Sequence, residues 1–547
     1  MDSKRGLHHG VFVAAAVLVL WLLGALLLSA SLAENGARPV YLIDDTYIHM
    51  AMARNMAEHG VWGVTRRGFS SSSSAPLWTG CIALAYAVFG VGEWPPLLLA
   101  LVCVSGMLIT LLFYFRTRHG LGGPGLFLLS LAWIGLVPLP YLVFSGLEHG
   151  LQIWLDLLFV LTLVGLLDGG EAGARHRVWL VVLASLVVLV RYEGLFLVAA
   201  AVLVLLFRRE VRTAVFTALA ALAPVVAYGV FSLAKGWYFL PNSVLLKGNR
   251  PALTGLSGAL DFLVHGLRQL VYNVHLLVLV LLVVALLTLY RGRGEDRRAG
   301  PVFLGWIFVL TTVMHMFFAR SGFFLNYYYQ VRYDAYLTGL GLLAATALLL
   351  GRPRVEAEKR PLTRGVLVLI LSVVLLPLVE RGLRTTLKIV PATHATFSHQ
   401  VQLGDFLARH YEGRSVALND IGGANFFADI RCLDILGLGS REVADLILRN
   451  RYDRGALAGL ARREGVEIAV INADLLEDAG GVPPSWREVA RWRLLKNVVS
   501  SEDVVSFYAV APGSEGRLRE ALASFARLLP EGVAVEWPAA APERGST

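Results

Sequence analysis

Two hydrophobic patterns divide the chain near residue 385. Before this point, uncharged apolar runs of about 20 residues, long enough to cross a bilayer, follow one another from residue 11 onward. After it, charged residues are frequent and the apolar residues fall in short runs. The change predicts a membrane module over residues 1–384 and a polar domain over residues 385–547.

The polar domain shows the alternation of strand and helix patterns that is typical of an α/β fold. Residues 415–420 and 467–471 are short apolar runs, as expected of buried strands, and residues 441–449 and 515–529 have the spacing of amphipathic helices.

Composition supports the membrane assignment. The chain has 547 residues, of which 56% are hydrophobic and 16% charged, and its mean hydropathy is +0.62. These values exclude a soluble multidomain protein of this length. The net charge of +9 does not indicate nucleic-acid binding, because most Lys and Arg residues lie in short loops between apolar runs. The three cysteines have no metal-binding or redox spacing.

The basic loops predict the topology, because such loops stay in the cytoplasm. The N-terminus is then cytoplasmic, and about eleven spans place the C-terminal domain outside the membrane. Residues 77–89 are expected to form a re-entrant or interfacial helix rather than a full span. The polar loops at 145–149, 191–194, 235–250 and 320–334 all fall on the external side, together with the first external loop, residues 33–79.

Asp44 and Asp45 are the strongest candidates for chemistry. They are adjacent carboxylates in an apolar context just after the first span, and neighbouring like charges raise each other's proton affinity. A solvated turn is the alternative interpretation.

Further candidates interrupt apolar runs, where charged groups are costly and are usually functional or paired. Glu148 with His149, and Arg191 with Glu193, are two such pairs, for which a helix-start carboxylate and a hairpin turn are the structural alternatives. The remaining candidates are Asn242, Lys247, Tyr327, Tyr328 and Arg332. Lysine and arginine suit a phosphate and tyrosines suit a sugar ring, whereas an aromatic belt with a snorkelling lysine is the structural alternative.

The order of the motifs resembles the GT-C superfamily of integral-membrane glycosyltransferases, and is most similar to its arabinofuranosyltransferase-like branch and uncharacterised bacterial relatives. The C-terminal motifs Asn-Asp-Ile-Gly-Gly (419–423) and Asp-Ile-Leu-Gly-Leu (434–438) also resemble the external domain of such proteins. The membrane-module motifs are Asp-Asp-Thr-Tyr-Ile (44–48), Ser-Ala-Pro-Leu-Trp (74–78), Ser-Gly-Leu-Glu-His (145–149), Arg-Tyr-Glu-Gly (191–194), Leu-Pro-Asn-Ser (240–243) and Arg-Tyr (332–333).

The resemblance implies a polytopic GT-C-like fold and transfer of a hexosyl or pentosyl unit from a polyprenyl-phosphate donor. The acceptor would be a glycan, lipid or protein outside the bacterial cytoplasmic membrane. Such a reaction needs a base near the acceptor hydroxyl and a cationic site for the departing phosphate. We expect Asp44 to be the base and Asp45 to orient the acceptor. Lys247 and Arg332 would bind the phosphate, with Arg191 as a third candidate, and Tyr327, Tyr328 and Trp78 would line the sugar or lipid groove.

Two questions stay open at the level of sequence. Asp45 and Glu148 could help bind a divalent cation such as Mg²⁺ or Mn²⁺, but such ions need several oxygen ligands. A membrane transporter of a small solute or a lipid-linked sugar is the alternative function, although the chain shows no internal repeat of the kind that many transporters have.

Overall fold

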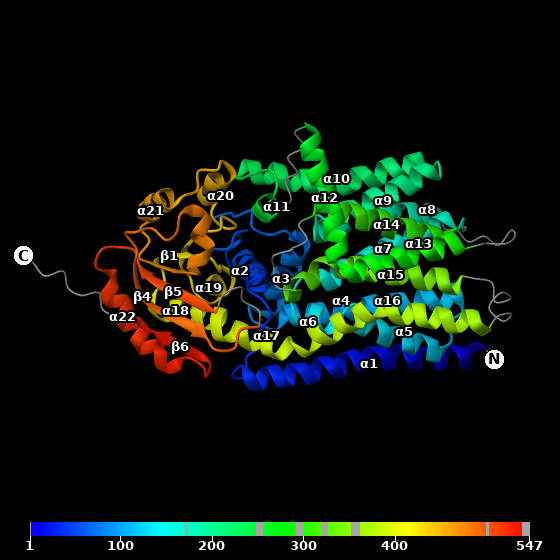
Figure 1. Ribbon diagram of the computed structural model, residues 1–547, viewed down its shortest axis with the longest axis horizontal. Helices are drawn as coiled ribbons and strands as arrows, with labels where there is room; N and C mark the ends of the chain where they lie inside the picture. The colour runs from blue at the N-terminus through cyan, green and yellow to red at the C-terminus, as the bar shows by residue number, and fades with distance from the viewer. Residues whose placement is uncertain are drawn as a thin grey trace, which may run out of the picture.

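The protein is a long helical bundle with a mixed α/β domain at one end (Figure 1), as seen in a computed structural model. The structure describes residues 2–169, 173–247, 255–290, 299–319, 327–351, 361–498 and 503–538. The helices of the membrane module are α1 (Asp2–Glu34), α2 (Asp44–His59), α3 (Pro76–Phe89), α4 (Pro95–His119), α5 (Gly123–Leu136), α6 (Leu139–Phe144), α7 (His149–Leu167), α8 (Gly173–Val190), α9 (Gly194–Phe207), α10 (Val211–Ala234), α11 (Asn242–Lys247), α12 (Gly255–Tyr272), α13 (Val274–Leu289), α14 (Gly300–Phe318), α15 (Tyr327–Leu350) and α16 (Pro361–Leu387).

Seven helices of the described part are long and apolar enough to cross a membrane. The count rises to eight if α12 and α13, which meet at a bend of 93°, form one broken span. The predicted multi-pass helical architecture is confirmed, but the count of about eleven spans is not. Several expected spans are short helices, among them α9, which pairs with α8 across a turn at residues 191–193.

Helix α3 accounts for the segment expected to be re-entrant or interfacial. Its 14 residues extend about 21 Å at 1.5 Å per residue, less than the ~30 Å of a hydrocarbon core. Pro76 starts the helix and Gly90 follows its last residue. In Figure 1, α2 and α3 lie between the bundle and the α/β domain.

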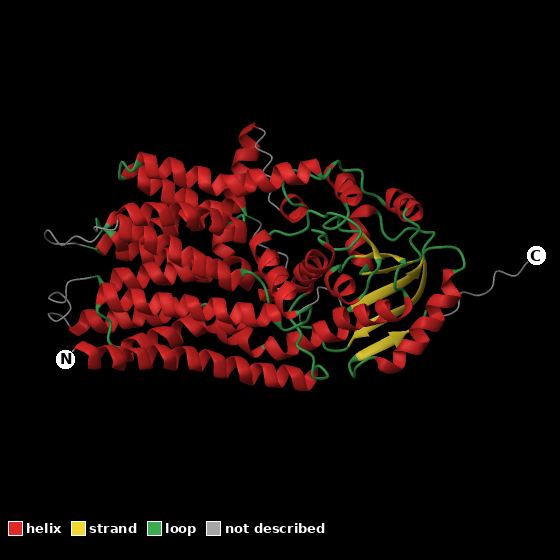
Figure 2. Cartoon of the chain, turned by 180° about the vertical axis from the view of Figure 1, so that it is seen from behind, coloured by secondary structure: helices red, strands yellow, loops and turns green. Residues whose placement is uncertain are grey.

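The C-terminal domain is built on a six-stranded sheet with the order β2-β1-β3-β5-β4-β6 (Figure 2). Strands β1, β2 and β3 are mutually parallel where they pair, and the remaining pairs are antiparallel. The strands are β1 (Ser415–Leu418), β2 (Arg431–Asp434), β3 (Ile468–Ile471), β4 (Arg487–Leu494), β5 (Val504–Ala509) and β6 (Val533–Glu536). The helices are α17 (Ile389–Thr396), η2 (Phe397–Val401), α18 (Gln402–His410), α19 (Gly422–Phe427), α20 (Arg441–Leu448), α21 (Arg454–Arg463), η3 (Ala473–Ala479), α22 (Ser514–Phe525) and η4 (Ala526–Leu528).

The sheet is covered on both faces, which explains the uninterrupted apolar strands. Val416 and Leu418 of β1 pack with residues of α18 and α22 on one face. Ala417 points to the other face, where α20 and α21 pack. The predicted C-terminal α/β domain is therefore confirmed. The boundary proposed at residue 385 falls in the last turn of α16 and stays a prediction.

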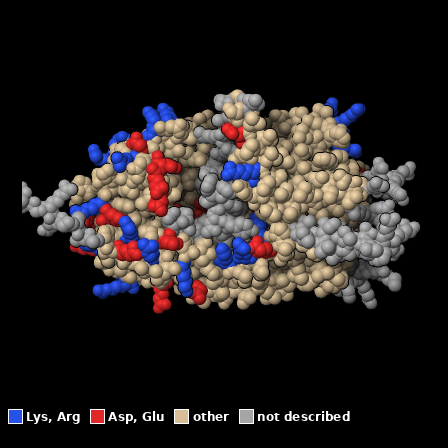
Figure 3. Space-filling model, in the orientation of Figure 1, with Lys and Arg blue, Asp and Glu red and all other residues tan. Residues whose placement is uncertain are grey.

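Side-chain contacts join the domain to the membrane module. Arg54 of α2 donates hydrogen bonds to the carbonyl oxygens of Phe426, at 2.7 Å, and Asn425, at 3.1 Å. The hydroxyl of Ser72 donates to the Leu438 carbonyl at 2.8 Å. The serine run at 70–74 thus runs along the junction between the two parts. Figure 3 shows that Lys, Arg, Asp and Glu gather over the domain, while most of the helical surface is uncharged.

Candidate active site

Several candidate residues converge where α2 begins, between the helical bundle and the α/β domain. They are Asp44, Asp45, Glu148, Arg191 and Arg332. The surface is hollowed between these two parts in Figure 3. Asp44 and Asp45 form the first turn of α2, where carboxylates are favoured by the helix dipole. The structure therefore places the pair at a junction of two modules rather than in a solvated turn.

Asp44 connects the membrane module to the C-terminal domain. Its two carboxylate oxygens accept hydrogen bonds from the backbone N–H groups of Gly422, at 2.7 Å, and Gly423, at 2.8 Å. Burial and the nearby charge of Asp420 raise the pKa of the Asp44 carboxyl to about 8, although the two amide donors favour its ionised form. Asp44 is thus a fixed carboxylate with a high proton affinity.

Asp45 is the more open member of the pair. Its side chain is 33% exposed and accepts a hydrogen bond of 2.7 Å from the guanidinium of Arg332, which is only 6% exposed. Arg332 also lies over the ring of Tyr333, with 4.7 Å between its Cζ and the ring centroid. The structure therefore brings Asp45 and Arg332 together, and their roles in a reaction stay predictions.

Arg191 forms a second cationic centre, but two carboxylates surround it. Its guanidinium donates to Glu148 and, through two nitrogens, to Glu193. Burial opposes the ionisation of Glu148, but the charge of Arg191 lowers its pKa below the usual range. Arg191 lies 5.6 Å from the centroid of the Tyr333 ring, so both arginines contact one aromatic side chain.

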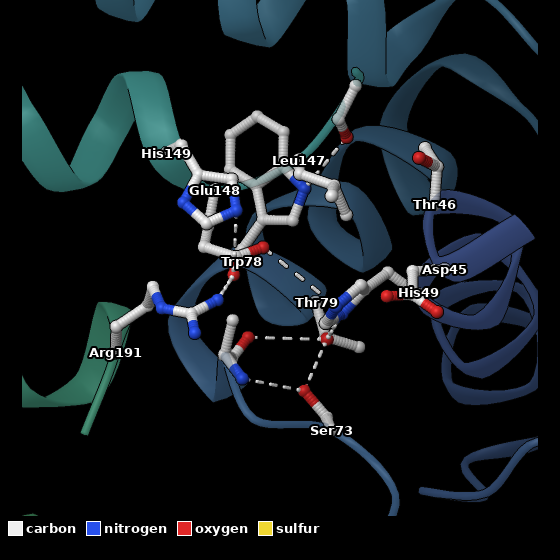
Figure 4. A network of polar contacts seen from close by, with 12 residues as sticks. Asp45, Thr46, His49, Ser73, Trp78, Thr79, Leu147, Glu148, His149 and Arg191 are labelled. Carbon is white, nitrogen blue, oxygen red and sulfur yellow. Dashed lines mark hydrogen bonds and ion pairs between the residues drawn. The ribbon is translucent and has the colours of Figure 1, made fainter. Parts of the chain in front are cut away.

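A chain of polar contacts leads from this centre back to α2 (Figure 4). The Nε2 atom of His49 lies 3.9 Å from Glu148, and its Nδ1 atom is hydrogen-bonded to the Thr79 hydroxyl at 2.7 Å. Thr79 in turn contacts the Ser73 hydroxyl at 3.0 Å. The sequence analysis missed His49 and Thr79. His49 could have been found, because it lies one helical turn after Asp45.

Two predicted substrate contacts have structural roles instead. Trp78 is 1% exposed, and its indole N–H donates to the Gly146 carbonyl at 3.1 Å, so it packs in the core and does not line an open groove. Asn242 is fully buried and donates to the Gly437 carbonyl at 2.7 Å. Its backbone N–H also bonds to Ser71, so the Pro-Asn motif holds the C-terminal domain against the membrane module.

Of the remaining candidates, the structure describes the side chain of His149 and does not describe those of the other three. His149 begins α7 with its ring buried, 6.5 Å from the Tyr333 ring. The side chains of Lys247, Tyr327 and Tyr328 lie outside the described part of the structure, so their proposed roles stay predictions.

The C-terminal domain contributes three side chains that the sequence analysis did not select as site residues: Asp420, His399 and Gln400. Asp420 follows β1, and Nε2 of His399, from η2, lies 3.9 Å from its carboxylate. Gln400 donates to the same carboxylate at 3.4 Å. Asp420 sits in the Asn-Asp-Ile-Gly-Gly motif, just before the glycines that bind Asp44. That adjacency was the available signal.

The divalent cation considered for Asp45 and Glu148 stays a hypothesis, and both carboxylates form ion pairs within the protein. Each of these carboxylates faces a guanidinium, Arg332 or Arg191, at the position where a bound cation would have to compete. Within the described residues, no group of three or more His, Cys, Asp or Glu side chains could hold a metal ion.

The comparisons with known proteins agree with this architecture. A family model described as a domain of unknown function, DUF8728, matches residues 392–508. The chain matches no curated protein sequence. Among solved structures, ArnT from Cupriavidus metallidurans bound to undecaprenyl phosphate superposes with a TM-score of 0.52 at 14% identity, over 90% of this chain and 98% of ArnT.

Two further structures are similar. The apo state of the same ArnT has a TM-score of 0.51 at 13% identity, over 91% of this chain and 99% of that one. The mycobacterial arabinofuranosyltransferase AftD matches with a TM-score of 0.39 at 15% identity, over 91% of this chain and 40% of AftD. The likeness to ArnT extends over both the helical module and the C-terminal domain. The chain therefore has the fold of the GT-C glycosyltransferases, as the order of its motifs predicted.

Proposed function

We propose that the protein is a membrane glycosyltransferase that moves a sugar from a polyprenyl-phosphate donor to a cell-envelope acceptor. Three features support this function: the GT-C fold, the position of the charged site beside the bundle, and the undecaprenyl phosphate bound to ArnT. The acceptor would then lie outside the bacterial cytoplasmic membrane, on the same side as the C-terminal domain. The N-terminus would lie on the cytoplasmic side.

The observation that carries the proposal is that two adjacent carboxylates have different partners: Asp44 binds two backbone amides, and Asp45 binds the guanidinium of Arg332. Asp44 is oriented by two amides and has a raised pKa, which suits a general base because proton transfer is most efficient when the pKa is near the working pH. Each of its oxygens keeps a second lone pair for an acceptor hydroxyl. Asp45 holds the guanidinium of Arg332 next to that base.

Arg332 is the proposed site for the donor phosphate. A guanidinium can bind a phosphate through two parallel hydrogen bonds, and Asp45 is exposed enough for a substrate to approach this pair. Arg191 is a weaker candidate than the sequence suggested, because Glu148 and Glu193 together already exceed its charge. Lys247 remains a second proposed phosphate ligand.

The proposed reaction is a single displacement. Asp44 accepts the proton of the acceptor hydroxyl, whose oxygen attacks the anomeric carbon of the donor. The bond between that carbon and the phosphate oxygen breaks, and polyprenyl phosphate leaves with its charge stabilised by Arg332. The configuration at the anomeric carbon is inverted. Each step uses only groups of this chain and the two substrates.

The test is transfer in membranes supplied with labelled polyprenyl-phosphate hexoses and pentoses, followed by lipid extraction. We expect wild type to release free polyprenyl phosphate and Asp44→Asn at equal abundance to release almost none. Asp474→Asn is the matched control, since Asp474 is an exposed aspartate in the first turn of η3. Full activity of Asp44→Asn, or a product of retained configuration, would refute the mechanism. Solute counterflow in proteoliposomes without transfer would instead indicate a transporter.

A further inference from the structure

A small pocket lies between the first external loop and the C-terminal domain, apart from the charged site. Its volume is about 220 Å³. The domain side of the pocket is formed by Ile421, Cys432, Asp434 and Gly439. The other side is formed by residues of the loop after α2: Val64, Thr65, Arg67, Gly68, Phe69 and Ser70. Neither module could form this pocket alone.

In the α/β domain, the pocket lies beside two neighbouring parallel strands, β1 and β2. Its domain wall comes from strand β2 and from the segments that follow strands β1 and β2. These two strands are parallel, and β1 lies between β2 and β3 in the sheet. From β1 the chain passes to β2 on one side, and it later forms β3 on the other side of β1. The domain residues that line the pocket come from the β1–β2 side of this reversal.

The chemistry of the walls is mixed. Asp434 is buried, and its carboxylate oxygens accept the backbone N–H groups of Leu436, at 2.8 Å, and Gly439, at 2.6 Å. The Asp434 carboxylate therefore stabilises the loop that follows β2. Arg67 is exposed at the pocket and brings guanidinium donors, and Ile421 is an apolar lining residue. Phe69 also lines the pocket, while its ring packs edge-on against Phe231 and Trp237. A lining that combines polar and apolar residues is suited to a sugar, which has hydroxyl groups and apolar ring faces.

One residue that lines the pocket is next in sequence to a residue that binds the proposed base. Ile421 lines the pocket, and the next residue, Gly422, donates its N–H to Asp44. The segment that orients Asp44 through the Gly422 and Gly423 amides therefore also forms part of the pocket wall. The Arg332 side of the site, where the donor phosphate is proposed to bind, belongs to the membrane helix α15.

We propose that this pocket binds one sugar ring of the acceptor, a subsite formed jointly by the two modules. The assignment rests on the proposed glycosyl transfer and names its acceptor as a carbohydrate. The volume is below the ~300 Å³ at which drug-sized ligand pockets begin, which suits a single ring and is too small for a polyprenyl chain. The two C-terminal motifs of the sequence, at 419–423 and 434–438, then serve to build this subsite.

Gly68 allows the subsite to be blocked without disturbing the fold. It lines the pocket, and a Cβ atom at this position would meet no atom within 4 Å. A leucine there has space to extend without a clash. Gly459 on α21 is the matched control, because its Cβ would also meet nothing within 4 Å and it does not line the pocket. Arg67→Ala removes the exposed donor, with Arg462→Ala as its exposed control.

The first measurement is saturation-transfer NMR on the detergent-solubilised full chain, with a panel of methyl glycosides of neutral hexoses and pentoses. We expect transfer to at least one glycoside in wild type, Gly459→Leu and Arg462→Ala, and its loss in Gly68→Leu and weakening in Arg67→Ala. This readout needs no turnover, so it separates failure of the subsite from failure of the proposed reaction. No transfer to any glycoside in wild type, or undiminished transfer in Gly68→Leu, would overturn the proposal.

The second measurement is kinetic and uses the acceptor found by the transfer assay. We expect Gly68→Leu to raise the KM for the acceptor by about tenfold while the KM for the donor stays unchanged, since only acceptor binding is lost. Equal changes in both KM values, or none, would contradict the assignment.

Discussion

Helix α15 carries two ionic residues, Arg332 and Asp334, which are only two positions apart and point to different partners. Arg332 binds Asp45 at 2.7 Å. Asp334 binds Arg381 of α16 and lies 3.0 Å from Nε2 of His275 in α13. The two sets contain the same kinds of charge on one helix, but they differ in exposure and in the number of internal partners.

The Asp334 set is closed to solvent. The side chain of Arg381 is 1% exposed, and it also donates to the Val331 carbonyl at 3.0 Å and to the Thr338 hydroxyl at 3.3 Å. Asp45, in contrast, is one-third exposed. A buried ion pair joins helices, whereas an ion pair with an open side can exchange one partner for a substrate. The comparison teaches that exposure, rather than residue type, separates a structural ion pair from a candidate site in this bundle.

Among changes to these two ion-pair sets, the largest expected effect on activity is that of Arg332→Ala. We expect kcat for glycosyl transfer to fall by about 10²- to 10³-fold, because a donor that stabilises developing charge on the leaving group is lost. The midpoint of thermal unfolding should remain within a few degrees of wild type. A variant that unfolds early, or that keeps wild-type kcat, would place Arg332 in the structural class with Arg381.

Asp334→Asn should instead reduce stability. It leaves the buried Arg381 charge without a carboxylate, a change that costs about 3–5 kcal/mol. Thermal unfolding of the purified protein in detergent, followed by light scattering or size exclusion, measures the loss. The double variant Asp334→Leu with Arg381→Met should recover most of it, because a well-packed apolar pair can replace a buried ion pair. A stable but inactive Asp334→Asn protein would contradict the structural role.

A smaller effect is expected for Asp420→Asn, in the pH dependence of transfer. Asp44 must be ionised to accept a proton, so kcat/KM should rise with pH through the Asp44 pKa of about 8. Removing the charge of Asp420 removes one cause of this raised pKa and should shift the rise to lower pH by about one unit. The charged groups that act on Asp44 include Asp45 as well, which stays in place. An unshifted profile would show that Asp420 does not act on the base.

The smallest expected effect is that of a chelator. Because guanidinium groups face Asp45 and Glu148, we expect EDTA to change the transfer rate by less than about a factor of two. The control is the same membrane preparation after chelator removal and addition of Mg²⁺ or Mn²⁺. A rate that is lost with EDTA and restored by either ion would contradict the arginine-based site.

The architecture was predictable because it depends on local hydrophobic pattern. The turn near residues 191–194, which divides one apolar run into α8 and α9, follows from where apolar residues start and stop. The same holds for the strands that begin at residues 415 and 468. The number of spans was not predictable, since short apolar helices such as α3 and α9 resemble spans by composition and differ in length. The sequence predicted only that the polar loops lie on the same side of the membrane. It did not predict that four of their residues would come together: Asp45, Glu148, Arg191 and Arg332.

The sequence by itself determined the membrane class, the two-part organisation and the residue types that could carry transfer chemistry, because these depend on hydropathy and on motif order. The tertiary structure decided which charges are open and which are closed. It pairs Asp44 with Gly422, 378 positions away, and Trp78 with Gly146, 68 positions away. Such contacts depend on how helices and the α/β domain pack, and no local pattern encodes the exposure that results.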